Sequence, residues 1–174
     1  MTPGSPRDAA TRRCWISVGS NVDRKRSIRG AVADLRRHFG GLVISPVYET
    51  AAVGFEGDAF YNLVVGMDSD QSVAAINQTL RDIEDAHGRV RGPKKFAPRT
   101  LDLDLLTWGD AAGTIDGCAL PRDEILKYAF VLKPLADVAP TERHPETGQT
   151  YAALWEQMAQ DTGTLGRVPL ALPA

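Results

Sequence analysis

Apolar residues recur along this chain at two spacings, and the two spacings predict strands that alternate with helices. Four short apolar runs, bounded by glycine, asparagine or charged residues, are typical of β-strands. They cover residues 14–18, 42–49, 59–67 and 101–106. Two longer segments, which begin after Asp23 and Ser72, carry apolar residues three or four positions apart, as amphipathic helices do. The predicted order is strand, helix, strand, strand, helix, strand.

Both predicted helices have a polar residue before the first turn and a single apolar stripe. Asp23 and Ser72 are residue types that cap helices because their side chains accept backbone N–H groups, and Gly40 is a typical terminator of the first helix. The stripes are Ile28, Val32, Leu35 and Phe39, and then Val73, Ile76, Leu80 and Ile83. One stripe is expected to pack each helix against one layer.

The order of the elements indicates an α+β fold. A βαββαβ order is typical of a ferredoxin-like sandwich, an antiparallel sheet with helices on one face. We expect the other face to be free of helices and to carry the functional site. The remaining third is a less regular C-terminal extension, with a short helix expected near 120–125 and another over 151–160. Residues 1–11 are expected to be a disordered lead, and residues 12–174 a single domain.

Composition limits the classes of function. The 174 residues are 43% hydrophobic and 24% charged, which is ordinary for one globular domain. A net charge of -2, with no basic face across the chain, argues against nucleic acid as a partner. No apolar stretch approaches the ~20 residues of a membrane span and no signal peptide is apparent, so we expect a cytoplasmic protein without a membrane partner. Its two cysteines are expected to stay reduced.

Two aspartates alternate with leucines in the last predicted strand, Leu101-Asp102-Leu103-Asp104-Leu105. Alternation places the leucines on the buried face and both carboxylates on the other, about 7 Å apart along the strand. Such a pair suits Mg²⁺, which takes one or two carboxylates together with substrate phosphates. The alternative is an antiparallel strand with one solvated face.

A basic segment precedes this strand. Residues 88–99 carry five cationic side chains and no acidic one. Cations beside a carboxylate pair are what a metal-bound polyphosphate requires, because arginine side chains bind phosphate oxygens in a forked geometry. A solvated loop that balances local charge is the alternative.

Other phosphate and metal sites are excluded by their missing motifs. The chain has no Gly-x-x-x-x-Gly-Lys-Ser/Thr stretch and lacks the protein-kinase motifs. Its two cysteines and three histidines form no ligand pair at the spacing of a zinc site. Phosphate chemistry at the Asp-x-Asp strand is therefore the leading hypothesis.

Four motifs carry a family resemblance. They are Val18-Gly19-Ser20-Asn21, Tyr48-Glu49-Thr50 with Phe60-Tyr61-Asn62, Glu84 with Gly88-Arg89-Val90-Arg91, and Lys95-Phe96-Ala97-Pro98-Arg99-Thr100-Leu101-Asp102-Leu103-Asp104-Leu105-Leu106. With them, nearly the whole chain resembles the 6-hydroxymethyl-7,8-dihydropterin pyrophosphokinase family of folate biosynthesis. The resemblance implies a ferredoxin-like monomer, with 12–174 as its pyrophosphokinase domain. It implies transfer of diphosphate from ATP to the pterin with release of AMP, and small molecules as the substrates.

The resemblance also implies roles for single residues. Asp102 and Asp104 would hold two Mg²⁺ ions, and Arg89 and Arg99 would contact the transferred phosphates, which makes these four the implied catalytic residues. The implied pterin-binding residues are Thr50, Val53, Phe60, Asn62 and Phe130. The implied ATP-binding residues are Glu84, Arg91, Lys95, Arg99, Leu105 and Arg122.

Several of these residues have an ordinary structural alternative. A lone phenylalanine such as Phe60 or Phe130 is more often packed in a core, and a helical glutamate such as Glu84 is usually solvated. Asn62 needs a hydrogen-bond partner in its predicted strand.

Two departures from the family pattern leave other functions open. Phe96 stands where the family commonly has tryptophan, and Arg122-Asp123 stand where many members have histidine and tyrosine. Arg122 would then meet an α-phosphate or a ribose, and together with Tyr128 would replace the missing pair. The alternatives are a diphosphate or nucleotidyl transferase of the same fold that acts on another acceptor, and a pterin-binding paralogue with weakened catalysis.

Overall fold

The structure is a computed structural model. It describes residues 11–50, 59–88, 101–158, 165–170 and 172. The predicted lead over 1–11 lies outside the described residues except for Thr11, so the division into a lead and one domain stays a prediction. Within the described ranges, no helix is both long enough and apolar enough to span a membrane.

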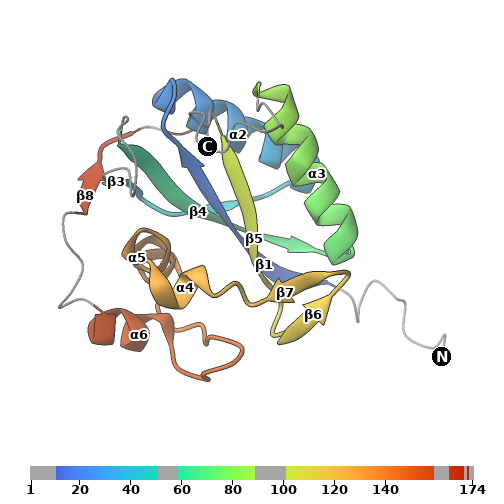
Figure 1. Cartoon of the computed structure of the whole chain (residues 1–174), viewed down its shortest axis with the longest axis vertical. Helices are drawn as coiled ribbons and strands as arrows, with labels where there is room; N and C mark the ends of the chain where they lie inside the picture. Colours follow the sequence, from blue (N-terminus) through green and yellow to red (C-terminus); the bar gives the residue numbers. More distant parts are fainter. Residues whose placement is uncertain (1–10, 51–58, 89–100, 159–164, 171, 173–174) are drawn as a thin grey trace.

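Six strands form one antiparallel sheet (Figure 1). They are β1 (Arg12–Ser20), β2 (Val43–Ile44), β3 (Val47–Thr50), β4 (Phe60–Ser69), β5 (Asp102–Trp108) and β8 (Gly166–Val168). The order is β5-β1-β4-β3-β8, and β2 also pairs with β4. Strand β1 lies between β4 and β5 and runs antiparallel to both. The predicted antiparallel sheet and the α+β class are confirmed.

The strand predicted over 42–49 is wrong as a single element, because the structure divides it into β2 and β3. Both pieces pair with β4, but Ser45 and Pro46 between them are not in a strand. Proline has no N–H group to donate to a ladder, which interrupts pairing at this point. Ser45 compensates, since Val64 N–H donates to its Oγ at 2.8 Å and its own N–H donates to Val64 O at 3.0 Å.

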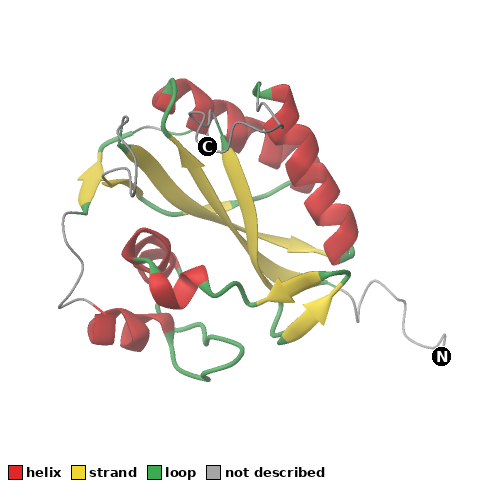
Figure 2. Ribbon diagram, in the orientation of Figure 1, coloured by secondary structure: helices red, strands yellow, loops and turns green. Residues whose placement is uncertain are grey.

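Helices α2 (Arg24–Phe39) and α3 (Val73–Ala86) cover one face of the sheet (Figure 2). Their predicted stripes pack there against the inward side chains of β1, β4 and β5. Ser72 caps α3 as predicted, accepting the Ala75 N–H at 3.1 Å. The cap predicted for Asp23 is wrong: its side chain makes no cap bond, and its backbone is left-handed at φ 46° rather than in the extended conformation of most N-caps.

The C-terminal extension covers part of the other face, which was expected to be free of helices. It contains the hairpin β6 (Gly113–Ile115) and β7 (Cys118–Leu120), and then α4 (Glu124–Lys127), α5 (Ala129–Val138) and α6 (Tyr151–Met158). Trp15, Val64 and Leu106 of the sheet form a second core with α4, α5 and α6. The site expected on this face is thereby confined to the uncovered end of the sheet.

Candidate active site

The Asp-x-Asp strand has the predicted alternation. Leu101, Leu103 and Leu105 are at most 4% exposed and belong to the core under α2 and α3. Asp102 and Asp104 alternate with them on the opposite face, where the Asp104 side chain is 45% exposed. Partial exposure of Asp104 is compatible with a solvated strand face and also with a binding site. The residues that surround the two carboxylates decide between these alternatives.

A row of residues crosses the sheet beside Asp102. In the strand register, Gly19 on β1 pairs with Asp102 on one side and with Asn62 of β4 on the other. A Cβ atom on Gly19 would lie 3.0 Å from Asn62 Oδ1, so glycine leaves the room that the Asn62 side chain occupies. The amide and the carboxylate thus lie on the same face, with only backbone between them.

The partner that Asn62 was expected to need is Thr50. Asn62 Nδ2 donates to Thr50 Oγ1 at 3.1 Å, which joins the end of β3 to the start of β4. Both residues line a cavity of about 260 Å³ on the uncovered part of the face. Its lining is Ser17, Gly19, Thr50, Phe60, Asn62, Asp102, Asp104, Glu124, Tyr128, Phe130 and Val131. We call it the small cavity.

Aromatic side chains from two elements line the small cavity. Phe60 begins β4 and Phe130 lies in α5, and neither is fully buried in a core. Tyr128 stacks on Phe130, with ring centroids 5.0 Å apart and the planes inclined by 17°. Flat apolar walls with a few polar groups are typical of pockets for planar heterocycles. Core packing alone therefore does not account for the two phenylalanines.

A second cavity, of about 960 Å³, opens on the other side of the aspartates. It lies between α3, β5 and the segment from β6 to α4, and we call it the large cavity. Three of the implied ATP-binding residues line it, namely Glu84, Leu105 and Arg122. Asp102, Asp104 and Glu124 line both cavities. The carboxylates of β5 therefore stand where the two spaces meet.

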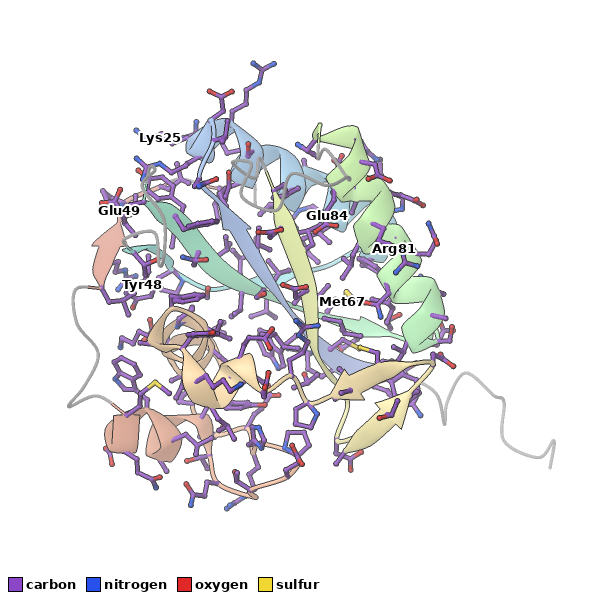
Figure 3. The ribbon with its side chains drawn as sticks, in the orientation of Figure 1. Lys25, Tyr48, Glu49, Met67, Arg81 and Glu84 are labelled. Atoms are coloured by element: carbon purple, nitrogen blue, oxygen red, sulfur yellow. The ribbon has the colours of Figure 1, made fainter. Side chains whose placement is uncertain are left out.

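Glu84 is buried, contrary to the solvated position expected of a helical glutamate. It is 6% exposed, and its side chain extends from α3 toward β5 (Figure 3). The N–H of Leu103 donates to its Oε2 at 2.8 Å. Strand β5 is at the edge of the sheet, and a carboxylate that accepts an edge N–H group satisfies a donor that no strand pairs. Glu84 therefore holds the backbone between the two aspartates.

Arg122 forms an ion pair beside Asp104. Its Nε and Nη2 atoms lie 2.8 Å and 2.6 Å from Oε2 of Glu124. Nη2 is also 4.0 Å from Oδ1 of Asp104. Burial raises the pKa of Glu124, a hydrogen bond with Asp123 acts in the same direction, and the bond from Arg122 opposes both.

Sequence reasoning assigned no role in the small cavity to five of its lining residues: Ser17, Gly19, Glu124, Tyr128 and Val131. The alternation that places Asp102 and Asp104 on one face also places Ser17 and Gly19 there, so the pattern of the first strand contained that signal. Nothing local marks Glu124, because the approach of α4 to the sheet decides its position.

The other implied site residues lie outside the described residues. These are Val53 of the implied pterin site and Arg89, Arg91, Lys95 and Arg99 of the implied phosphate contacts. Phe96, which departs from the family pattern, also lies outside the described residues. Their roles stay predictions.

The donor set of β5 fits magnesium. Mg²⁺ is usually bound by one or two carboxylates and substrate phosphates rather than by an all-protein cage. Asp102 and Asp104 supply the carboxylates beside a cavity large enough for a nucleotide. Among the described residues, no group of three or more histidine, cysteine, aspartate or glutamate side chains gathers as a self-sufficient metal cage.

Known proteins resemble this chain in sequence and in fold. Residues 15–140 match the family model described as 7,8-dihydro-6-hydroxymethylpterin-pyrophosphokinase. The 2-amino-4-hydroxy-6-hydroxymethyldihydropteridine pyrophosphokinase of Bacillus subtilis is 32% identical, over 82% of this chain and 90% of that one. The protein of the same name from Synechocystis is 34% identical, over 91% of this chain and 83% of that one.

A solved structure of Plasmodium falciparum HPPK-DHPS with pteroate matches the fold. Its TM-score is 0.69 at 13% sequence identity, and the match covers 87% of this chain and 44% of that longer one. At this level of sequence identity, the likeness shows a shared fold. On the family model and the two bacterial relatives, this chain belongs to the 7,8-dihydro-6-hydroxymethylpterin-pyrophosphokinase family.

Proposed function

We propose that this chain transfers the terminal diphosphate of ATP to the hydroxymethyl oxygen of 6-hydroxymethyl-7,8-dihydropterin, forming AMP and the pterin diphosphate. The observation that carries the proposal is the meeting of two cavities at Asp102 and Asp104. One cavity is small and aromatic, and the other is large and polar. This arrangement, with charged groups at the junction, suits a reaction that joins a planar acceptor to a polyphosphate.

In the small cavity, the pterin would lie against Phe60 and Phe130. Asn62 and Thr50 are already hydrogen-bonded to each other and can read the polar edge of the ring. The implied backbone contact at Val53 would complete this edge. Burial between rings supplies binding energy, and the amide fixes the orientation of the ring.

In the large cavity, the nucleotide would lie along β5 and the start of α4. Glu84, Leu105 and Arg122 line this space. Arg89, Arg91, Lys95 and Arg99 are proposed as further contacts with the polyphosphate, on the strength of the family motif. Arginine side chains at the transferred group stabilise the charge that develops during transfer.

The reaction needs positioning more than covalent catalysis. The hydroxymethyl oxygen forms a bond to the β-phosphorus, and the bond from that phosphorus to the oxygen bridging the α-phosphate breaks. AMP leaves with the bridging oxygen, and the hydroxyl proton passes to a base, for which Asp102 and Asp104 are candidates. When Mg²⁺ ions are bound, they neutralise phosphate charge and acidify the hydroxyl group. Asp102 and Asp104 are proposed to hold two of them.

The same family pattern supports three further proposals. The chain acts as a monomer, works in the cytoplasm, and has only small molecules as obligate partners.

The proposal is tested by AMP formation from ATP and Mg²⁺, with and without 6-hydroxymethyl-7,8-dihydropterin. We expect AMP only when the pterin is present, in equal amount to the pterin diphosphate. AMP formation with other acceptors but not with the pterin would instead support a transferase of the same fold. Tight pterin binding without AMP would support a paralogue with lost catalysis, and either result would overturn the proposal.

A further inference from the structure

The guanidinium group of Arg122 lies between two carboxylates that come from different parts of the fold. It makes two short contacts with Glu124 of α4, at 2.8 Å and 2.6 Å, and its Nη2 is 4.0 Å from Asp104 Oδ1 on β5. All three side chains line the large cavity. A positive charge therefore stands beside Asp104 in the space where a metal-bound nucleotide would enter.

The backbone holds this arrangement in place. The N–H of Arg122 donates to the carbonyl of Leu106 at 2.9 Å, only two residues beyond Asp104 on β5. Ile125, next to Glu124, is 0% exposed in the core between α4 and the sheet. Arg122 and Glu124 are thus anchored from both sides, unlike a pair of long side chains on a free surface. Less conformational entropy is lost when such a pair forms.

A fixed cation beside Asp104 opposes the binding of a second cation there. Like charges within about 4 Å repel each other, and the repulsion is stronger at a partly buried site than in water. A bare divalent ion must overcome this repulsion. For a metal ion that binds together with a polyphosphate, this repulsion is offset, because the phosphate oxygens accept forked hydrogen bonds from Arg122.

We propose that Arg122, held by Glu124, is a built-in counter-charge of Asp104 that makes the aspartate pair bind a divalent cation together with a nucleotide polyphosphate rather than alone. The inference rests on the proposed function in one respect, that Asp104 binds the metal. By thermodynamic linkage, the factor by which the nucleotide strengthens metal binding equals the factor by which the metal strengthens nucleotide binding. Removing Arg122 should reduce this shared factor.

The test uses Mn²⁺ as the probe, with free ion measured by electron paramagnetic resonance. Arg122→Ala is expected to tighten the binding of Mn²⁺ alone about three- to tenfold, and to reduce the gain in Mn²⁺ affinity on adding the α,β-methylene analogue of ATP by a similar factor. Arg13→Ala is the matched control. Arg13 has the same 36% exposure and an ion pair of 2.8 Å, with Asp68, but it lines neither cavity. Unchanged Mn²⁺ affinity in Arg122→Ala, or an equal change in Arg13→Ala, would overturn the inference.

Two further variants separate the possible causes. Arg122→Lys keeps the charge but loses the forked geometry, so binding of Mn²⁺ alone should stay close to the unsubstituted level; tightening as large as in Arg122→Ala would contradict a charge effect. Asp104→Asn should weaken Mn²⁺ binding in the unsubstituted background. If Mn²⁺ binding is unchanged in Asp104→Asn, the metal assignment of the proposed function fails and the inference fails with it. If Asp104→Asn weakens Mn²⁺ binding but Arg122→Ala has no effect, only the inference is rejected.

Discussion

The two faces of the sheet are built from alternate residues of the same strands, yet their surroundings differ sharply. Under α2 and α3, Ile16, Leu63 and Leu103 are at most 4% exposed and belong to the apolar core. One residue further along β5, the Asp104 side chain is 45% exposed and lines two cavities. A single step along a strand separates the sealed core from the candidate site.

The second face is itself divided into a covered and an uncovered part. Trp15, Val64 and Leu106 are buried by the C-terminal helices, whereas Gly19 and Asp102 line the small cavity. Charged and polar side chains that are left unpaired in a core cost stability, so the uncovered part is where they are tolerated. Packing and chemistry are therefore assigned to different places on one sheet, and the effect of a substitution should depend on its place.

Asp104→Ala should have the largest effect, and only on activity. We expect diphosphate transfer to fall by about 10³-fold or more, because a group that binds and neutralises transition-state charge is lost. The midpoint of thermal unfolding should change little, since the side chain is half exposed. AMP formation and circular dichroism measure the two quantities. Full activity in this variant, or in Asp102→Ala, would contradict the metal assignment.

Leu103→Ala should have the opposite profile at the neighbouring position. Removing a buried leucine side chain from the core under α3 should lower the free energy of unfolding by about 2–4 kcal/mol. The folded fraction should keep its turnover, because the Leu103 side chain is 4% exposed in the apolar core and carries no charged or polar group that could act on a substrate. Urea unfolding with activity measured at low temperature tests this. Loss of turnover without loss of stability would show that the two faces are not separate in function.

Two glycines test the division of the second face. Gly19→Ala places a Cβ atom 3.0 Å from Asn62 Oδ1, so we expect the KM for the pterin to rise about tenfold while the KM for ATP stays unchanged. Gly66→Ala, the control in the covered part, places a Cβ atom 2.5 Å from the Trp15 ring. It should lower the unfolding free energy by about 1–3 kcal/mol and leave both KM values intact. The reverse pattern would reject the division.

The smallest effect concerns pH and the segment that covers this face. His144 is 1% exposed, and its Nδ1 accepts the N–H groups of Glu146 and Thr147 at 3.2 Å each, which requires a neutral nitrogen. Burial lowers the pKa of His144 below its usual value. Protonation therefore favours the unfolded chain, so stability should be complete above pH ~6.5 and should decline as pH falls below it.

Urea unfolding at several pH values measures this dependence, with His144→Gln as the control. The variant should lose the part of the pH dependence between pH ~6.5 and the lowered pKa of the native state. An identical pH profile in both proteins would mean that His144 does not link the covering segment to pH.

Local patterns in the sequence predicted most elements of the sheet and both of its first helices. Alternation at Leu101, Asp102, Leu103 and Asp104 was sufficient to separate core from site, because the period of a strand leaves only two faces. Interruptions of a strand and additional strands were harder to predict from the sequence. Pro46 divides a predicted strand, and β8 joins the sheet from the far end of the chain, where short apolar runs give little signal.

Local residue order was enough to show which side chains alternate between core and solvent, and the Asp-x-Asp motif indicated the family to which the chain belongs. Tertiary structure alone decided what surrounds those residues. It buried Glu84 against the edge of β5, brought Arg122 and Glu124 beside Asp104, and covered part of the face expected to be open. The physical reason is that alternation is a property of neighbouring residues, whereas a cavity and its charges arise from segments that are distant along the chain.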